Sequence, residues 1–99
     1  SFTFAGRETE RVRPALVLLD VRDGDVLVAR VTGRSQGTPY DVSISGWSAA
    51  GLLMPAVVRV HKLATIGKSL VERPLGKLRR DDWKNVCRVL QILWRDSAP

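Results

Sequence analysis

The spacing of apolar residues predicts strands along most of the 99-residue chain and a helix at its end. From residue 14 to 32, PALVLLDVRDGDVLVARVT places two apolar runs around a polar Arg-Asp-Gly-Asp segment. This pattern is typical of a β-hairpin in which Gly24 supplies the turn. Continuous apolar runs of this kind indicate strands that are covered, or nearly so, on both faces.

The middle of the chain predicts shorter strands separated by turns. A loop punctuated by glycine and proline precedes a short strand in which Val42 and Ile44 alternate with polar residues. GWSAAGLLMP, residues 46–55, is too short for a long helix and ends at a proline, so we expect a single turn or a structured loop. AVVRVHKLATI and KSLVERPL then predict two further strands, with Pro74 at a strand end or edge.

The last segment has a helical period. Apolar residues recur every three or four positions at Trp83, Val86, Cys87, Leu90, Leu93 and Trp94. Asp81 and Asp82 near the start and Arg95 near the end suit the helix dipole, which predicts one amphipathic helix over about residues 80–95. Val89 and Ile92 widen its apolar face, so part of that face could pack on a second subunit, although burial within one subunit is favoured.

Strands in series followed by one helix predict a mainly β protein, a small and strongly curved antiparallel sheet or barrel with the helix docked on it. We expect residues 1–99 to form a single domain, because a hydrophobic content of 44% suits one modest core. The opening SFTF alternates like the end of a strand, which leaves open whether this strand begins upstream.

Composition narrows the chemistry. Cys87 is the single cysteine and His61 the single histidine, so we expect no disulfide, no tetrahedral metal site and no cofactor, and a structural role for both residues. GKS at 67–69 resembles the end of a phosphate-binding loop, but Lys62 stands where that loop needs glycine. No stretch approaches the roughly 18 apolar residues of a membrane span, and no signal peptide is visible, so we expect a cytoplasmic protein with no membrane partner.

The net charge of +6 favours a polyanionic partner, either nucleic acid or an acidic protein segment. Two polar segments, AGRETERVR and TGRSQGTPY, flank the predicted hairpin strands. They carry four basic residues and three neutral hydrogen-bonding residues, namely Arg7, Arg11, Arg13, Arg34, Thr32, Ser35 and Gln36. If the strands are neighbours, these loops form one basic groove suited to phosphodiester chemistry, where fixed donors stabilise a phosphorane. The alternative is a pair of ordinary solvated loops.

Four segments in order, RPALVL, VLVARVTGRSQGTPYDV, GLLMPAVVRVHKL and GKLRRDDWKNVCRVL, make the chain resemble the MazF/PemK toxins of bacterial toxin-antitoxin pairs. The resemblance covers about residues 2–94. It implies a curved SH3-like barrel with a terminal helix, a homodimer, and a metal-independent endoribonuclease that cleaves single-stranded RNA (mRNA) at short sequences. It also implies a cognate antitoxin whose disordered, acidic tail occupies the RNA groove.

The resemblance also implies site residues. Arg13, in the Arg-Pro pair, falls on the family's catalytic arginine, and Thr32 falls on its catalytic threonine. Glu8 falls near a glutamate that is important in some members. Ala56 stands near a position where other members have aspartate, which leaves the general base open. Arg7, Arg11 and Arg34 are then expected to hold RNA phosphates, with Ser35 and Gln36 among the RNA-binding groups and Gln36 reading base edges.

The hypothesis that follows is attack of a 2′-hydroxyl on its own phosphodiester, giving a 2′,3′-cyclic phosphate and a 5′-hydroxyl end. Two alternatives stay open at this point. One is a toxin of the same fold that poisons gyrase, and the other is a module that binds nucleic acid or antitoxin without catalysis. Neither alternative needs both Arg13 and Thr32.

Overall fold

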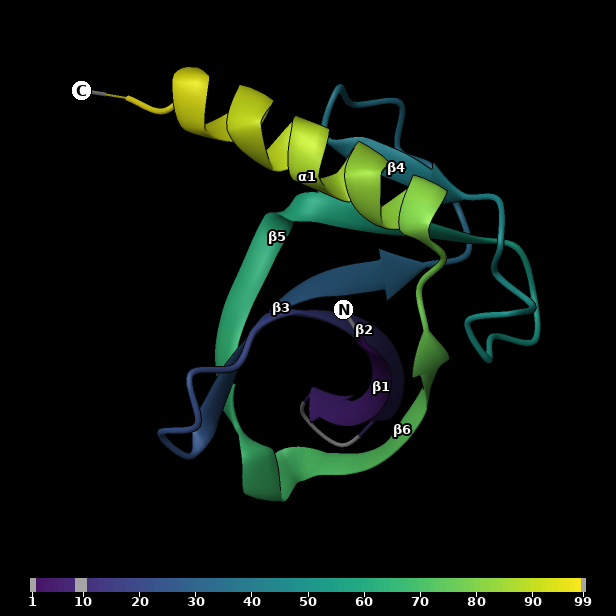
Figure 1. The fold of residues 1–99 in the computed structure, drawn as a ribbon, viewed down its shortest axis with the longest axis vertical. Helices are drawn as coiled ribbons and strands as arrows, with labels where there is room; N and C mark the ends of the chain where they lie inside the picture. The colour runs from purple at the N-terminus through teal and green to yellow at the C-terminus, as the bar shows by residue number, and fades with distance from the viewer. Residues whose placement is uncertain (1, 9–10, 99) are drawn as a thin grey trace.

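The computed structural model describes the backbone of residues 2–8 and 11–98, and the side chains from residue 13 to residue 98. The strands are β1 (Phe2–Glu8), β2 (Arg11–Leu19), β3 (Asp25–Thr32), β4 (Asp41–Ile44), β5 (Ala56–Gly67) and β6 (Val71–Lys77). A short 3-10 turn, η1 (Lys68–Leu70), precedes β6, and the chain ends in helix α1 (Arg80–Arg95). The six strands form one sheet in the order β4-β5-β3-β2-β1-β6, with all neighbours antiparallel (Figure 1).

The predicted fold class is confirmed, because the protein is mainly antiparallel sheet with a C-terminal helix. The sheet curls strongly, and β5 bends from the region beside α1 to the opposite end, where it leads into β6 (Figure 1). The ends of the strand order are β4 and β6, so the curl does not close into a complete barrel. The expected barrel is therefore an open, strongly curved sheet.

The predicted hairpin is β2 and β3, which pair from Ala15 opposite Arg30 to Leu19 opposite Leu27. Gly24 lies in the turn with φ of +94°, a conformation that glycine adopts without strain. Both strands are buried on two faces, as expected. One face of the pair contributes to a large cluster through Leu16, Ala29 and Val31, and the other face contributes to a small one that consists of Val17, Val26 and Val28.

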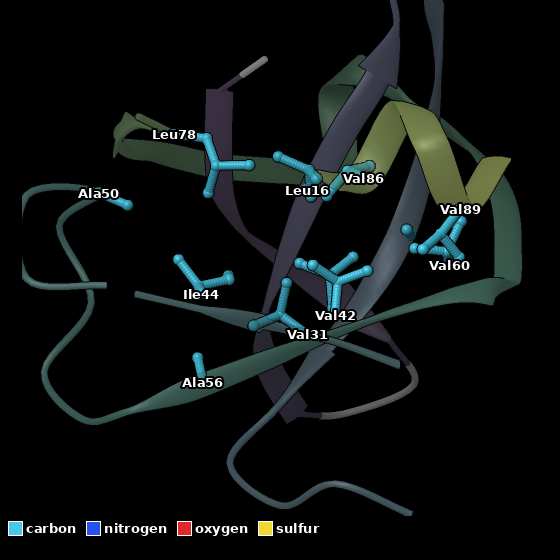
Figure 2. Packing of buried hydrophobic residues seen from close by; sticks show 12 residues of the cluster. Leu16, Val31, Val42, Ile44, Ala50, Ala56, Val60, Leu78, Val86 and Val89 are labelled. Carbon is cyan, nitrogen blue, oxygen red and sulfur yellow. The ribbon is translucent and has the colours of Figure 1, made fainter. Parts of the chain in front are cut away.

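The large cluster lies between the sheet and α1. Its side chains from β2, β3, β4, β5 and α1 converge in Figure 2, where Leu16, Val31, Val42, Ile44, Val60, Val86 and Val89 are labelled. The helix boundaries match the prediction at both ends. Trp94, at the far end of the apolar stripe, is 79% exposed, and Cys87 is half-buried rather than part of the core. No helix in the described part of the chain is long and apolar enough to cross a membrane.

Two expectations were wrong. AGRETERVR is not a loop, because β1 continues to Glu8 and β2 begins at Arg11. The pairing of β1 with both β2 and β6 supplies backbone hydrogen bonds that outweigh the polar composition of this segment. KSLVERPL is not one strand, since its first three residues form η1 and β6 then runs through Pro74. Pro74 does lie in an edge strand, as its missing N–H predicts.

Candidate functional site

A pocket of about 850 Å³ opens beside the ends of the central strands. Three segments line it: the start of β2 with the end of β3, the loop before β5, and the middle of β6. Their lining residues are Arg13, Pro14, Val31, Thr32, Gly33, Gly51, Leu52, Leu53, Met54, Pro55, Ala56, Arg73, Pro74 and Leu75. A volume of this size is typical of ligand sites.

The hairpin register brings Arg13 and Thr32 together. The pairing of β2 with β3 joins Ala15 to Arg30, and continuing the register by two residues would place Arg13 opposite Thr32. Both residues line the pocket and both are half-buried. The two residues that the family resemblance marks as catalytic therefore share one pocket, on neighbouring strands of a rigid hairpin.

Arg73 of β6 is a third polar lining residue, and the sequence analysis missed it. It reaches the pocket because β1 pairs with β2 on one side and β6 on the other. Gly6 of β1 lies opposite Arg13, and Ala5 lies opposite Arg73. Adjacent strands are spaced by about 4.8 Å, so the two arginine backbones lie roughly 10 Å apart across β1. The available signal was the repeated Arg-Pro pair at 13–14 and 73–74, since all four residues line the pocket.

Another part of the pocket lining is apolar. We call Leu52, Leu53, Met54 and Pro55 the apolar wall. Leu53 is 94% exposed and Met54 is 70% exposed, which is unusual for side chains of this size. The wall is thus a hydrophobic surface that faces solvent directly beside two arginines.

Close backbone packing fixes the apolar wall. Gly51 has φ of +86°, and a Cβ built on it would lie 2.0 Å from the carbonyl oxygen of Leu75. A Cβ on Gly76 would lie 2.6 Å from the carbonyl oxygen of Ala50. Only glycine permits these two segments to approach so closely. The loop before β5 is therefore pressed against β6, the strand that carries Arg73.

A buried carboxylate holds the start of the same loop. Asp82, in the first turn of α1, is only 1% exposed. Its Oδ1 accepts hydrogen bonds from Ser45 N at 3.0 Å and Ser45 Oγ at 2.9 Å, and its Oδ2 accepts one from Gly46 N at 2.8 Å. The position of Asp82 at the helix N-terminus is also favourable for a negative charge. Helix α1 thus anchors the loop that builds the apolar wall.

The loop 33–40 lies on the other side of Thr32, and a second carboxylate holds it. Asp41 Oδ2 accepts hydrogen bonds from Gln36 N at 2.9 Å and Thr38 N at 3.3 Å, and Asp41 Oδ1 accepts one from Arg59 Nε at 3.1 Å. Burial acts to raise the pKa of Asp41, but the Gln36 N–H, the Arg59 guanidinium and the Thr38 N–H outweigh it and lower that pKa. The conformation of this loop therefore depends on an ionised carboxylate.

The tip of that loop does not line the pocket. Arg34, Ser35 and Gln36 were expected in one groove with Arg13 and Thr32, yet they are exposed and do not line the pocket. Ser35 Oγ accepts a hydrogen bond from Gly37 N at 3.2 Å, and Gln36 Nε2 donates to Arg34 O at 3.5 Å. The polar side chains at the tip thus contribute to the loop's own structure.

His61 lies beside Arg59, which binds Asp41, and does not line the pocket. This placement is in keeping with the structural role expected for it. Its ring lies 5.2 Å from the Tyr40 ring between centroids, and its Nε2 is 3.4 Å from Arg59 Nη2. Its Nδ1 is buried and has no hydrogen-bond partner among the residues that the structure describes. Burial, with the charges of Arg59 and Lys62, lowers the pKa of His61, so the neutral ring is favoured. Tyr40 in turn donates a hydrogen bond from its hydroxyl to Asp96 Oδ2 at 2.9 Å.

The remaining candidates lie at the N-terminal end of the chain. Arg7 and Glu8 are in β1 and Arg11 is in β2, and the register pairs Glu8 with Arg11 and Arg7 with Val12. Their side chains lie outside the described residues. Among the lining residues that are described, none is acidic, and Arg13 and Arg73 make the pocket cationic. The arrangement can hold an anion with two guanidinium groups and one hydroxyl, next to an apolar surface.

No group of three metal-ligating side chains occurs in the part of the chain that the structure describes. The donor set of the pocket, two guanidinium groups and a threonine hydroxyl, suits an anion rather than a cation. The chemistry available in the pocket is therefore electrostatic stabilisation and hydrogen bonding.

Several solved structures have a similar fold. The Mycobacterium tuberculosis toxin MazF-mt6 is 20% identical, with a TM-score of 0.83 over 99% of this chain and 100% of that one. An endoribonuclease in complex with its cognate antitoxin from Mycobacterial species is 16% identical, with a TM-score of 0.83 over 99% and 95%. A MazE-MazF structure from Deinococcus radiodurans (Form-II) is 22% identical, with a TM-score of 0.79 over 97% and 93%.

These identities are low, so the solved structures show a shared fold. A search of curated protein sequences finds no match. A sequence model for the PemK-like, MazF-like toxins of type II toxin-antitoxin systems matches residues 2–94, nearly the whole chain. The protein belongs to this toxin family.

Proposed function

We propose that this toxin is a metal-independent endoribonuclease that cuts single-stranded RNA, with mRNA in the cytoplasm as its target. The observation that carries the proposal is the pocket in which Arg13 and Thr32 lie on neighbouring strand ends, with Arg73 as a second cation. A scissile phosphate in this pocket would meet fixed donors on one side. Endoribonuclease is also what two similar structures from Mycobacterial species are called.

The reaction is an internal transesterification. The 2′-hydroxyl oxygen attacks the adjacent phosphorus and loses its proton, and a pentacovalent phosphorane forms. The bond between phosphorus and the 5′ oxygen then breaks, and that oxygen takes up a proton. The products are a 2′,3′-cyclic phosphate and a 5′-hydroxyl end. Because the phosphorane carries more negative charge than the substrate, donors already held in place stabilise it selectively.

Each residue has a separate part in this proposal. The Arg13 guanidinium stabilises the phosphorane, and the Thr32 hydroxyl donates a hydrogen bond to a phosphate oxygen. Glu8, at the end of β1, is the carboxylate to be tested in proton transfer. Arg7, Arg11 and Arg34 hold neighbouring phosphates, while Ser35 and Gln36 contact bases at the exposed tip of the loop 33–40. The cleavage rate of the Glu8→Gln variant tests whether Glu8 accepts the proton of the 2′-hydroxyl.

The proposal includes two protein partners. The net charge of +6 suits a cognate antitoxin with an acidic segment, and structures with the same fold include a complex with a cognate antitoxin. A homodimer is the expected assembly, with part of the wide apolar face of α1 in the contact. Sedimentation of the purified protein over a range of concentrations measures the assembly directly.

The first test is cleavage of a long single-stranded RNA in EDTA, with mapping of cut positions and end groups. We expect discrete cuts with 5′-hydroxyl ends for the wild type, and at least about 10³-fold slower cleavage for Arg13→Ala. The matched control is Arg88→Ala, which removes an exposed arginine of α1 far from the pocket lining. No cleavage by folded wild-type protein contradicts the proposal and directs attention to gyrase.

A second variant tests the hydroxyl group of Thr32 without changing the shape of the side chain. Thr32→Val keeps the volume and branching of the side chain while removing the donor. Its circular dichroism and thermal unfolding should stay close to those of the wild type, whereas cleavage should fall about 10²-fold. Cleavage at the wild-type rate would show that the Thr32 hydroxyl does not contact the reacting phosphate.

A further inference from the structure

We propose that the apolar wall and Arg73 together form a subsite for the nucleotide next to the scissile phosphate, with its base on Leu53 and Met54 and its phosphate on Arg73. The inference rests on the proposed nuclease function, since it assumes that an RNA chain enters the pocket. It adds two specificity-determining groups that neither the sequence analysis nor the family resemblance identified.

The first argument is the chemical asymmetry of the pocket. Arg13, Thr32 and Arg73 supply its polar side chains, and the other described lining residues are aliphatic, proline or glycine. A nucleotide has the same asymmetry, because its phosphate is anionic and the faces of its base are poorly hydrated. Single-stranded RNA presents unstacked bases that can leave water for an apolar surface.

The second argument is the room available. Arg13 and Arg73 are separated by one strand, a spacing of roughly 10 Å between their backbones. A pocket of about 850 Å³ exceeds what a single phosphate needs. An arginine on each side of β1 gives the pocket enough cationic groups to hold a second phosphate of the same chain.

The third argument is rigidity. Leu53 and Met54 are exposed apolar side chains, yet their backbone is held by the Gly51 and Gly76 contacts with β6 and by the Asp82 hydrogen bonds. Holding an exposed apolar surface in place costs conformational entropy and gains no burial within the subunit. A preorganised surface of this kind lowers the entropic cost of binding a base.

The absence of aromatic residues from the described lining predicts the kind of selectivity. Leucine, methionine and proline contact a base through its shape and offer no hydrogen bonds to its edges. Methionine adapts to irregular surfaces. The subsite should therefore prefer bases by size, purine against pyrimidine, rather than by their donor and acceptor pattern.

The test uses two variants and two matched controls. Leu53→Ser with Met54→Ser removes the apolar wall, and Val21→Ser, another exposed aliphatic residue, in the β2–β3 turn, is its control. Arg73→Gln removes the second cation, and Arg88→Gln in α1 is its control. Cleavage is measured on an RNA with randomised positions around the mapped cut, and binding on a 2′-fluoro RNA that lacks the attacking hydroxyl.

We expect the double serine variant to lose about 10-fold of its base-size preference at one position beside the cut, with no change in the salt dependence of binding. Arg73→Gln should bind 2′-fluoro RNA more weakly and reduce the slope of log K against log salt by about 0.7, which corresponds to one lost contact with a single-strand phosphate. A merely structural role for Arg73 would leave that slope unchanged. Both controls should match the wild type.

The outcomes separate the subsite from the nuclease itself. Wild-type cleavage with unchanged base preference and unchanged salt slope in the variants overturns the subsite and leaves the nuclease standing. Loss of inhibition by antitoxin in the double serine variant, with base preference intact, assigns the apolar wall to a peptide and also overturns it. If the wild type binds 2′-fluoro RNA through both groups but leaves the same RNA with its 2′-hydroxyls uncut, the subsite stands and the nuclease falls. No RNA binding at all contradicts both.

Discussion

Two loops border the candidate site, and they are built in opposite ways. The loop 33–40 follows Thr32, carries the exposed Arg34, and is held by hydrogen bonds from Gln36 N and Thr38 N to the ionised Asp41. The loop 45–55 carries the apolar wall and is fixed along its length by Asp82 and by glycine contacts with β6. Each has one carboxylate that accepts backbone N–H groups. The first loop contacts β5 at its last residue, Tyr40, whereas the second loop packs backbone to backbone against β6 at Gly51.

The difference assigns different properties to the two sides of the pocket. A loop with open space around its tip can adjust to a bound chain, whereas a loop packed against β6 presents an unchanging surface. The glycines show this directly, since a Cβ on Gly37 would meet no atom within 4 Å while a Cβ on Gly51 would meet the backbone of Leu75. The candidate site is therefore bordered by one loop with an exposed polar tip and by another that presents a fixed apolar surface.

The largest effect should come from Gly51→Ala. The residue has φ of +86°, and the added Cβ would collide with the carbonyl oxygen of Leu75, so the backbone must move. We therefore expect a loss of about 3 kcal/mol in the free energy of unfolding by urea. The matched change is Gly37→Ala, which has φ of +71° but open space around it, and should cost about 1 kcal/mol. Equal losses would show that the contact with β6 does not hold the loop.

Asp82→Ala tests the hydrogen bonds that hold the start of the loop 45–55. It leaves the N–H groups of Ser45 and Gly46 without their acceptor at a buried site, so we expect a loss of about 2 to 3 kcal/mol in urea unfolding. Asp82→Asn retains one acceptor oxygen and should lose less. If the alanine and asparagine variants were equally stable, the hydrogen bonds to Ser45 and Gly46 would not be the source of the effect.

The loop 33–40 should instead be sensitive to acid through Asp41. Its pKa is lower in the folded protein than the ordinary value of 3.8, so its contribution is complete above that value and is lost as pH falls through the folded pKa. Asp41→Asn should cost about 1 to 2 kcal/mol at pH 7 and show a weaker fall in stability between about pH 5 and pH 2. Asp20, whose pKa is lowered by its hydrogen bond to Lys68, titrates in both proteins and cancels in the comparison.

The smallest effect concerns His61, which packs against Tyr40 beside the same support. The folded pKa of His61 lies below its ordinary value of 6.5, so the unfolded chain takes up a proton first as pH falls. Stability should therefore be complete above about pH 6.5 and decline below it, by less than about 1 kcal/mol down to about pH 5.5. His61→Phe keeps the ring contact and should remove this slope. A slope that persists in His61→Phe must come from another group.

The elements that sequence predicted well are those whose signals are local. Helix α1 carries its apolar period, its acidic first turn and its basic last residue within a 16-residue span, so its limits could be predicted. The β2–β3 hairpin carries its own turn at Gly24, so its amino-acid pattern alone predicted the pairing of the strands that begin and end near Arg13 and Thr32. Both elements depend on residues that are close in the chain.

The parts that sequence missed depend on distant pairing. The segment 5–13 is polar enough to be mistaken for a loop, and only its pairing with β6, which joins Gly6 to Val71, completes the strand on both sides. The same pairing brings Arg73 to the pocket. A residue 60 positions from Arg13 gives no local sign of this proximity, apart from the repeated Arg-Pro pair.

The open space around Gly37 affects how the length of this loop can change during evolution. Lengthening a flexible loop costs only about 0.6 kcal/mol for each doubling, so insertions at the tip 34–37 leave the domain stable. An insertion near Gly51 would separate it from Leu75 and dismantle the wall. Descendants of this toxin can therefore vary the segment beside Thr32 in length while keeping the fold.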